Sequence, residues 1–373
     1  MTTYAAAPVS TYPMRRWVFE DAAGNHDIDL GDSNLPPGTL DELASVGDLE
    51  LDYGHNRGIP RLRALVAGLY GTDEDNILVT HGAQQALYLV YTALLRPGDQ
   101  VITFRPGWQQ SWDMPAELGA QVDVLGHRPD LSVDVEAAAA VAGDRLRLIV
   151  VNSPCNPTGR RISDEDLAAL HALTERTGAY LLLDEDYAID LAESAALRLP
   201  RTFSVSSLSK VYGYPGLRVG WLYGPAELVA ACTERKFLSN IGNSVLCETL
   251  ACDVLERREH YTARYRELTT AGLDVVRDWA ARNTDAVELV EPQGTPFAWF
   301  RLLTGEAPLD LCRRALALRV LLMPGETLGA SDGFRLCFAR EPDQITEGLR
   351  RIDTVLRPRA SHDAVHDPTS GAV

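Results

Sequence analysis

The stretch that decides the fold is SVSSLSKVYGYPGLRVGW, at residues 204–221. It contains Lys210, one of only two lysines in a chain that has 33 arginines. A desolvated lysine amine can lose its proton and form a Schiff base with a carbonyl group, which a guanidinium cannot do. The lysine at this position therefore indicates chemistry that needs an amine. The other lysine, Lys236, lies in the charged sequence TERKFL and is expected at the surface.

The composition predicts a globular protein with one large or two ordinary domains, since 46% of the 373 residues are hydrophobic and 23% are charged. A net charge of -17 argues against a nucleic-acid partner. No apolar run reaches the roughly 18 residues of a membrane helix, and the first residues lack the apolar stretch of a secretory signal. Six scattered cysteines without a CxxC pair favour reduced thiols over disulfides or a metal site. We expect a cytoplasmic protein without a membrane partner.

Apolar runs of strand length alternate with segments of helical period, which is typical of an α/β protein with a mostly parallel sheet. The expected strands cover residues 76–80, 100–104, 146–152, 179–186, 202–207 and 217–223, and a helix is expected at 164–178.

From about residue 262 the pattern changes to a long helix, then strands at 286–290, 297–303 and 334–339 around a helix at 308–319. This pattern predicts a smaller α+β domain. We expect an N-terminal segment that joins the small domain (1–47), a large domain (48–265), the small domain (266–357) and a disordered tail (358–373).

Ligands of open α/β sheets bind beyond the carboxyl ends of the strands, so the residues that follow each strand carry the information. The strand at 76–80 leads into HGAQQALYLVYTALL, where a glycine turn opens an apolar helix. The first N–H groups of such a helix suit a phosphate, and here they belong to Gly82, Ala83 and Gln84. A glycine before a helix can also be no more than a tight turn.

Two further strand ends carry polar side chains. The strand at 146–152 is followed by SPCNPTG, a turn that presents the amide of Asn156. The apolar run ending at residue 183 is followed by DEDY, which contains Asp184 and Tyr187. A carboxylate at this place needs a cation or a hydrogen-bond donor, because an unpaired buried charge is costly. Asp184 could instead cap the next helix.

A phosphate cradle, a carboxylate, an amide, a phenol and a reactive amine are the groups that pyridoxal phosphate needs. Together with SLSKVYGYPGLRVG, they resemble the fold type I pyridoxal-phosphate enzymes, in the class I and II aminotransferase family, over about residues 30–338. The resemblance implies an aspartate aminotransferase-like α/β fold. Its large domain has a mixed, mostly parallel seven-stranded sheet, and the smaller domain is α+β.

The resemblance also implies roles for the residues. Lys210 would hold the cofactor as a Schiff base and later move a proton, Asp184 would pair with the pyridine nitrogen, and Tyr187 and Asn156 would hydrogen-bond the ring hydroxyl. The phosphate contacts would come from Gly82, Ala83, Gln84, Ser207, Ser209 and Arg218.

Three further residues follow from the same resemblance. Trp108 would stack on the cofactor ring, although it could also be an ordinary core residue. Tyr53 in LDYGHNRGIPRLR matches the tyrosine that reaches the phosphate in the partner subunit, so a homodimer with shared sites is implied. Arg335 would grip the α-carboxylate of the substrate with a bidentate fork, unless it is a surface strand residue.

Departures from the common pattern indicate a specialised pocket. Ser33 and Asn34 stand where many members have a glycine-rich substrate lid, and His81, Thr295, Glu248 and the glutamines of GWQQSW are also unusual. The general pattern is similar to capreomycidine synthase-like natural-product enzymes that act on arginine-like amino acids.

The resemblance implies an enzyme that acts on an amino acid through a Schiff base with the cofactor and a carbanion at the α-carbon, as aminotransferases do. Cyclisation or replacement, decarboxylation, oxidative deamination and a non-catalytic cofactor-binding protein remain as alternatives, because the core motifs do not decide the fate of the carbanion. Other classes lack their own motifs: no GxGxxG turn indicates a dehydrogenase, and SLSK has neither SDN nor KTG of a β-lactamase.

Overall fold

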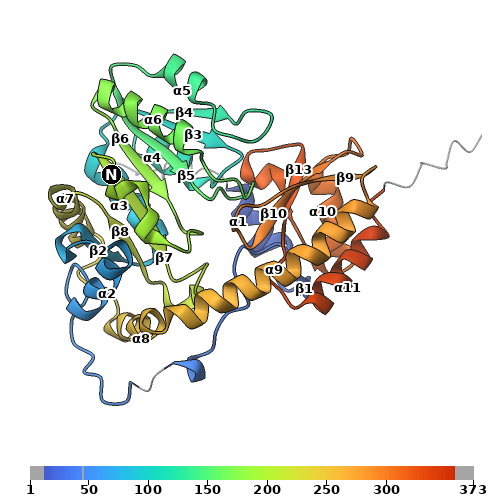
Figure 1. Ribbon diagram of the computed structural model, residues 1–373, viewed down its shortest axis with the longest axis horizontal. Helices are drawn as coiled ribbons and strands as arrows, with labels where there is room; N and C mark the ends of the chain where they lie inside the picture. Colours follow the sequence, from blue (N-terminus) through green and yellow to red (C-terminus); the bar gives the residue numbers. More distant parts are fainter. Residues whose placement is uncertain (1–11, 44–45, 358–373) are drawn as a thin grey trace, which may run out of the picture.

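The computed structural model describes residues 12–43 and 46–357. The predicted disordered tail at 358–373 and the first 11 residues of the N-terminal segment lie outside this part of the chain. Figure 1 shows a large α/β lobe and a smaller lobe that contains the last strands and helices. None of the helices in the described part of the chain combines the length and the hydrophobicity of a transmembrane segment.

The large lobe is built on a seven-stranded sheet. Its order is β2 (Ile77–Thr80), β8 (Gly220–Tyr223), β7 (Thr202–Ser207), β6 (Tyr180–Asp184), β5 (Leu146–Asn152), β3 (Gln100–Arg105) and β4 (Gln121–Gly126). Strand β8 runs antiparallel to both of its neighbours, and all other pairs are parallel. The predicted mixed, mostly parallel sheet is therefore confirmed.

Helices pack around this sheet, and their ends follow local capping rules. Helix α6 begins after Ser163, whose hydroxyl accepts a hydrogen bond from the Asp166 N–H, and it ends at Gly178, which has a φ of 74°. The helices of this lobe are α2 (Pro60–Tyr70), α3 (Gly82–Leu94), α4 (Gln110–Glu117), α5 (Val135–Val141), α6 (Asp164–Thr177), α7 (Ala226–Phe237) and α8 (Val245–Glu256).

The small lobe confirms the predicted α+β pattern. Its antiparallel sheet has the order β12 (Met323–Pro324), β13 (Gly333–Cys337), β10 (Phe297–Leu302) and β9 (Val287–Val290). Helices α9 (Arg258–Arg282), α10 (Pro308–Ala317) and α11 (Pro342–Asp353) complete the lobe.

Helix α9 connects the two lobes, as Figure 1 shows. Near its beginning, Tyr261 and Tyr265 pack in a core of the large lobe. Further along, Val276 and Trp279 pack in the core of the small lobe. We therefore propose that the domain boundary lies within this helix, close to the expected residues 265 and 266.

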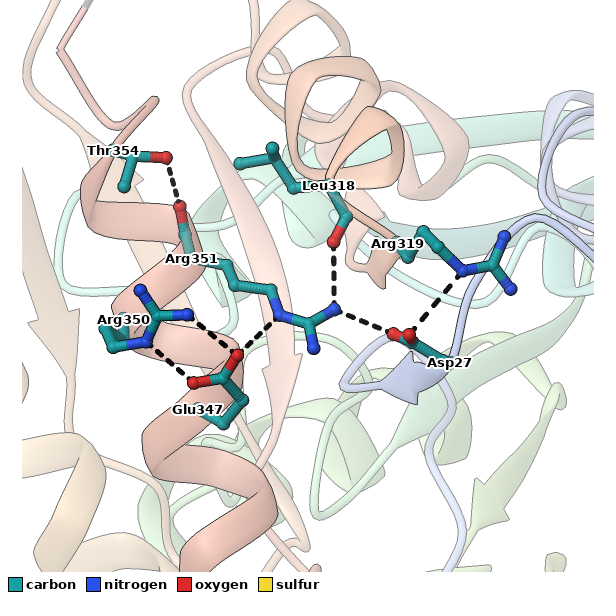
Figure 2. Close-up of polar contacts among 7 residues, drawn as sticks. All are labelled: Asp27, Leu318, Arg319, Glu347, Arg350, Arg351 and Thr354. Carbon is teal, nitrogen blue, oxygen red and sulfur yellow. Dashed lines mark hydrogen bonds and ion pairs between the residues drawn. The ribbon is translucent and has the colours of Figure 1, made fainter.

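The N-terminal segment is attached to the small lobe. Strand β1 (Ile28–Asp29) pairs in parallel with β11 (Val320–Leu321). Asp27 accepts a hydrogen bond of 2.8 Å from Arg351 and lies 3.5 Å from the guanidinium of Arg319. Figure 2 shows both contacts. Arg351 also donates to Glu347, so α11, the end of α10 and this segment form one polar network. The network fixes the start of the segment that continues to Ser33.

The prediction for Lys236 is wrong, because its side chain is fully buried in α7. Its Nζ donates hydrogen bonds of 2.5 Å to the carbonyl oxygen of Asn56 and of 2.9 Å to that of Val79. Burial lowers the pKa of Lys236 to about 8, although the charge of Glu248 opposes the change. The lysine thus joins α7 to the end of β2 and to the loop before α2.

This buried amine predicts a pH-dependent stability. The unfolded chain binds the Lys236 proton up to about pH 10.4, and the folded chain only up to about pH 8, so the free energy of unfolding should rise with pH between these values. The rise attributable to Lys236 should approach roughly 3 kcal/mol. Urea unfolding of wild type and Lys236→Met from pH 7.5 to 10.5 measures it as the change in their difference. A difference that stays constant with pH would contradict the assignment.

Candidate active site

A cavity of about 260 Å³ lies at the carboxyl ends of β5, β6 and β7 and reaches the beginning of α3. This is the edge at which the sequence predicts a ligand. The predicted site residues that line the cavity are Ser33, Asn34, Ala83, Gln84, Trp108, Asn156, Asp184, Tyr187, Ser207, Ser209, Lys210 and Arg218.

Lys210 follows β7 and points its amine into this cavity. Its Nζ donates hydrogen bonds of 3.0 Å to Ser33 Oγ and of 2.6 Å to Asn34 Oδ1. Burial lowers the pKa of Lys210, while the carboxylates of Asp32 and Asp186 oppose this shift. The amine is therefore held by neutral acceptors from the N-terminal segment, at a place where it can exist without its proton.

Asp184 ends β6 and is 6% exposed. Burial and then the charge of Asp186 raise the pKa of Asp184 to about 7, whereas the charge of Lys210 lowers it. Asp184 does not cap a helix, because the next helical turn along the chain is capped by Asp190. A buried carboxylate in a cavity fits a cationic partner such as a pyridinium nitrogen.

The predicted phosphate turn has the geometry of an anion site. Gly82 has a φ of 75° and begins α3, and no side chain caps this end of the helix. A Cβ atom on Gly82 would lie only 2.4 Å from Arg218 Nη2, so the absence of a side chain lets the guanidinium pack against the turn. A helix N-terminus beside a guanidinium fits the dianionic phosphate of pyridoxal phosphate.

The serines beside this turn are arranged differently from the expectation. Ser207 Oγ donates a hydrogen bond of 2.6 Å to Asp186 Oδ1 and accepts one of 3.0 Å from the Ser209 N–H. Because a hydroxyl has one proton, Ser207 offers no free donor to a phosphate in this arrangement. Ser209 Oγ accepts a bond of 3.4 Å from Arg218.

Trp108 and Tyr187 form two aromatic parts of the cavity wall. Trp108 is partly exposed, and its Nε1 donates a hydrogen bond of 3.1 Å to Gln84 Oε1, so it is not an ordinary core residue. Tyr187 is 3% exposed and packs at a right angle on Phe297, with the ring centroids 5.0 Å apart. Both side chains therefore keep fixed orientations beside Lys210.

Arg335 lies in β13 and is 2% exposed, so it is not a surface residue. Its Nη1 donates to Asn156 Oδ1 and its Nη2 to the Gly31 carbonyl, both at 2.6 Å. Its buried Nε has no hydrogen-bond partner among the described residues. An unsatisfied, buried guanidinium nitrogen is costly and fits an anionic ligand.

Arg335 borders a second cavity of about 670 Å³, which shares Ser33, Gln84, Trp108 and Lys210 with the first. Three carboxylates line this second cavity, those of Asp29, Asp32 and Asp113. None of them forms an ion pair with a described residue.

Neutral donors hold each of these three carboxylates. Asp113 accepts a hydrogen bond of 2.6 Å from Gln109, and Asp32 one of 2.8 Å from Asn34. Asp29 accepts backbone N–H groups of residues 31 and 32, at 2.9 Å each. Burial raises the pKa of Asp113. Acceptors of this kind leave room for a cationic group in the cavity.

Tyr53 is 82% exposed and does not line the cavity within this chain. Its loop contacts the loop after α7, since Asn56 Nδ2 donates to the Ile241 carbonyl at 2.9 Å. Large exposed apolar side chains are concentrated on these two loops and the helix ends beside them: Leu51, Leu238 and Ile241 on the loops, Phe237 at the end of α7 and Leu246 at the start of α8.

Four acidic residues of the two cavities did not enter the predicted site: Asp29, Asp32, Asp113 and Asp186. Asp32 and Asp186 stand beside predicted residues in GDSN and DEDY, so their positions in the sequence were a signal. Asp29 and Asp113 carry no such signal.

Comparison with known proteins identifies the family of this chain. The family model "Aminotransferase class I and II" matches residues 29–352. Capreomycidine synthase of Streptomyces vinaceus is 32% identical over 352 residues, covering 89% of this chain and 90% of the synthase.

Two solved structures share the fold over nearly the whole chain. A PLP-dependent aminotransferase from Streptococcus suis superimposes with a TM-score of 0.87 at 26% identity, covering 95% of this chain and 99% of that one. The PLP-dependent cyclase OrfR has a TM-score of 0.85 at 27% identity, with 96% and 100% covered. The chain therefore belongs to the class I and II aminotransferase family, as a pyridoxal-phosphate-dependent enzyme with an aspartate aminotransferase-like fold.

Proposed function

We propose that this enzyme transfers the amino group of an α-amino acid, with Lys210 as the reactive amine. The observation that carries the proposal is that the Lys210 amine, the Asp184 carboxylate and Arg218 line one cavity, with the Arg218 guanidinium packed against Gly82 at the beginning of α3. Pyridoxal phosphate, when bound, supplies a ring that withdraws electrons from the α-carbon of the amino acid.

The residues of the cavity divide the work among them. Arg218 and the first N–H groups of α3 hold the phosphate, and Asp184 keeps a proton on the ring nitrogen. Tyr187 and Asn156 orient the ring through its hydroxyl, and Trp108 covers the ring. Ser33 and Asn34 hold the amine of Lys210 in place. In this position the amine can take the proton from the α-carbon of the substrate and return it.

Arg335 holds the α-carboxylate of the substrate. The guanidinium is buried between Asn156 and the Gly31 carbonyl, and its unpaired Nε borders the second cavity. A planar guanidinium binds a carboxylate by two parallel hydrogen bonds, which also fixes the orientation of the substrate. The side chain of the amino acid then extends into the second cavity.

The test is product analysis of the purified enzyme with pyridoxal phosphate and a panel of amino acids, with and without a ketoacid acceptor, under air. We expect a near-visible absorption band that changes with a particular amino acid. Without an acceptor, at most one ketoacid per active site should form, and repeated turnover should need the acceptor. Turnover without an acceptor would replace transamination by cyclisation, replacement, decarboxylation or oxidation. A band that no amino acid changes would indicate a non-catalytic cofactor-binding protein, and no band at all would overturn the proposal.

A second candidate function is natural-product chemistry on an amino acid with a cationic side chain. The three carboxylates of the second cavity, none of them paired with a described cation, favour it. The names of two similar proteins, a capreomycidine synthase and a PLP-dependent cyclase, support cyclisation as the fate of the substrate.

A comparison of arginine with citrulline, its neutral isostere, tests whether the enzyme prefers a substrate with a cationic side chain. We expect kcat/KM for arginine to exceed that for citrulline by about tenfold to a hundredfold, because hydrogen bonds to a charged group are stronger. Asp113→Asn should remove most of this difference, because it should lower kcat/KM for arginine and leave kcat/KM for citrulline unchanged. Equal values for both substrates in the wild-type enzyme would contradict a cationic preference, while leaving the transamination test unaffected.

We also propose that the enzyme is a homodimer, with Tyr53 reaching the phosphate in the partner subunit. The exposure of Tyr53 and the apolar residues around it support a second copy of the chain as the cover of these loops. A location in the cytoplasm is a further proposal, supported by the six scattered cysteines, all of which are free thiols.

A further inference from the structure

Asp186 is a charged residue of the cofactor cavity that has no role in the proposed reaction. It lies two residues beyond Asp184, on the wall that also contains Ser207, Lys210 and Arg218. No cationic nitrogen of the described residues lies within 4.0 Å of its carboxylate, and its one close side-chain partner is the hydroxyl of Ser207, at 2.6 Å. A partly buried carboxylate held by a neutral donor keeps a strong field toward more distant charges.

Lys210 is the group on which this field acts most directly. Both residues line the same small cavity, and the Lys210 amine has only neutral hydrogen-bond partners, Ser33 and Asn34. Charged and titratable groups face the amine from every element around it: Asp32, Asp184, Asp186, Tyr187, Arg218 and Arg335. Without Asp186, the first cavity would contain two cations, Lys210 and Arg218, and one carboxylate.

We propose that Asp186 is a positioning residue for Lys210: the negative charge of Asp186, held in place by Ser207 on the wall of the same cavity, stabilises the ammonium form of the Lys210 amine. The role is electrostatic and acts across the cavity. The Ser207 hydrogen bond fixes where the charge lies, but it does not replace the charge.

Burial lowers the pKa of Lys210; among the carboxylates around it, Asp32 opposes this shift most strongly and Asp186 comes next. A proton carrier must both release and regain its proton near the working pH. The negative charge of Asp186 helps the Lys210 amine to regain its proton. The Asp186 carboxylate also disfavours the charge on Asp184. Asp186 therefore links the protonation of Lys210 to that of Asp184.

The small number of lysines allows a direct test on the full-length protein. After removal of the cofactor, brief acetylation with limiting acetic anhydride over a range of pH reports the neutral fraction of each amine, and peptide mass spectrometry separates Lys210 from Lys236. In Asp186→Asn, which keeps an acceptor for Ser207, we expect the midpoint for Lys210 labelling to fall by about one pH unit, or about tenfold more labelling at low pH. Lys236 is fully buried, so its labelling should stay low and equal in wild type and variant, and this serves as the control for an intact fold.

Two variants separate charge from hydrogen bonding. Ser207→Ala removes the hydroxyl and leaves the Asp186 carboxylate, so the midpoint of Lys210 labelling should stay close to that of wild type. Asp186→Glu also keeps the negative charge and should likewise leave this midpoint unchanged. An unchanged midpoint in Asp186→Asn, or the same fall in Ser207→Ala, would overturn the proposal. If Asp186→Asn does not fold, Asp186→Ser asks the same question. Because the labelling needs neither cofactor nor turnover, its outcome is independent of the transamination test.

Discussion

Replacing Lys210 by alanine is expected to reduce turnover by about 10²-fold to 10⁴-fold, the range found for loss of proton transfer by a positioned side chain. The variant should also lose the near-visible absorption band that we expect of the wild-type enzyme with pyridoxal phosphate, because among the described residues Lys210 alone places an amine in the first cavity. Both losses follow from one atom, the Lys210 Nζ. The measurement is kcat together with the absorption spectrum after dialysis against the cofactor.

Lys236→Met is the matched control for this experiment. It removes the only other lysine, which lies in α7 and hydrogen-bonds two backbone carbonyls outside the cavity. We expect it to keep the absorption band and turnover per folded molecule while losing stability. Lys210→Ala with a band like that of wild type would show that another group binds the cofactor.

Asp184→Asn should lower kcat by about 10²-fold to 10³-fold, the usual cost of removing one group that stabilises charge in the transition state. Asparagine keeps the size of the side chain but cannot hold a proton on the ring nitrogen by its charge. The cofactor should still bind, since Arg218 and the beginning of α3 are unchanged. The measurement is kcat with the best amino acid of the panel, at saturating cofactor.

The control for Asp184→Asn is the same substitution on the surface. Asp164 is 93% exposed at the beginning of α6 and pairs with Arg198, so Asp164→Asn should retain the wild-type kcat. Asp184→Asn with a normal kcat and a normal spectrum would mean that this carboxylate does not contact the ring nitrogen.

The central strands of the large lobe could be predicted because they are buried on both faces and therefore appear as continuous apolar runs. The predictions at 146–152 and 202–207 match β5 and β7 residue for residue. Strand β4 was not predicted, because it lies at the edge of the sheet and is only partly buried. Strands β11 and β12 have two residues each, too few for any period.

The site was predictable where residues follow strand ends, and not where it depends on contacts between distant segments. Lys210 lies in the turn that follows β7, and Asp184 is the last residue of β6. Because these two strands are parallel neighbours, the topology places both residues at the same edge of the sheet. The partners of Lys210 come from a segment 176 residues earlier, which the small lobe positions. The burial of Lys236 also depends on loops far from TERKFL, and the charged neighbours in that sequence pointed the other way.

Borohydride reduction of the enzyme in the presence of pyridoxal phosphate, followed by peptide mapping with mass spectrometry, identifies the amine that binds the cofactor. We expect one pyridoxyl phosphate group per chain, on Lys210, in the tryptic peptide that begins after Arg201. A label on Lys236, or no label on either lysine, would contradict the claim that Lys210 is the amine on which the enzyme's chemistry depends.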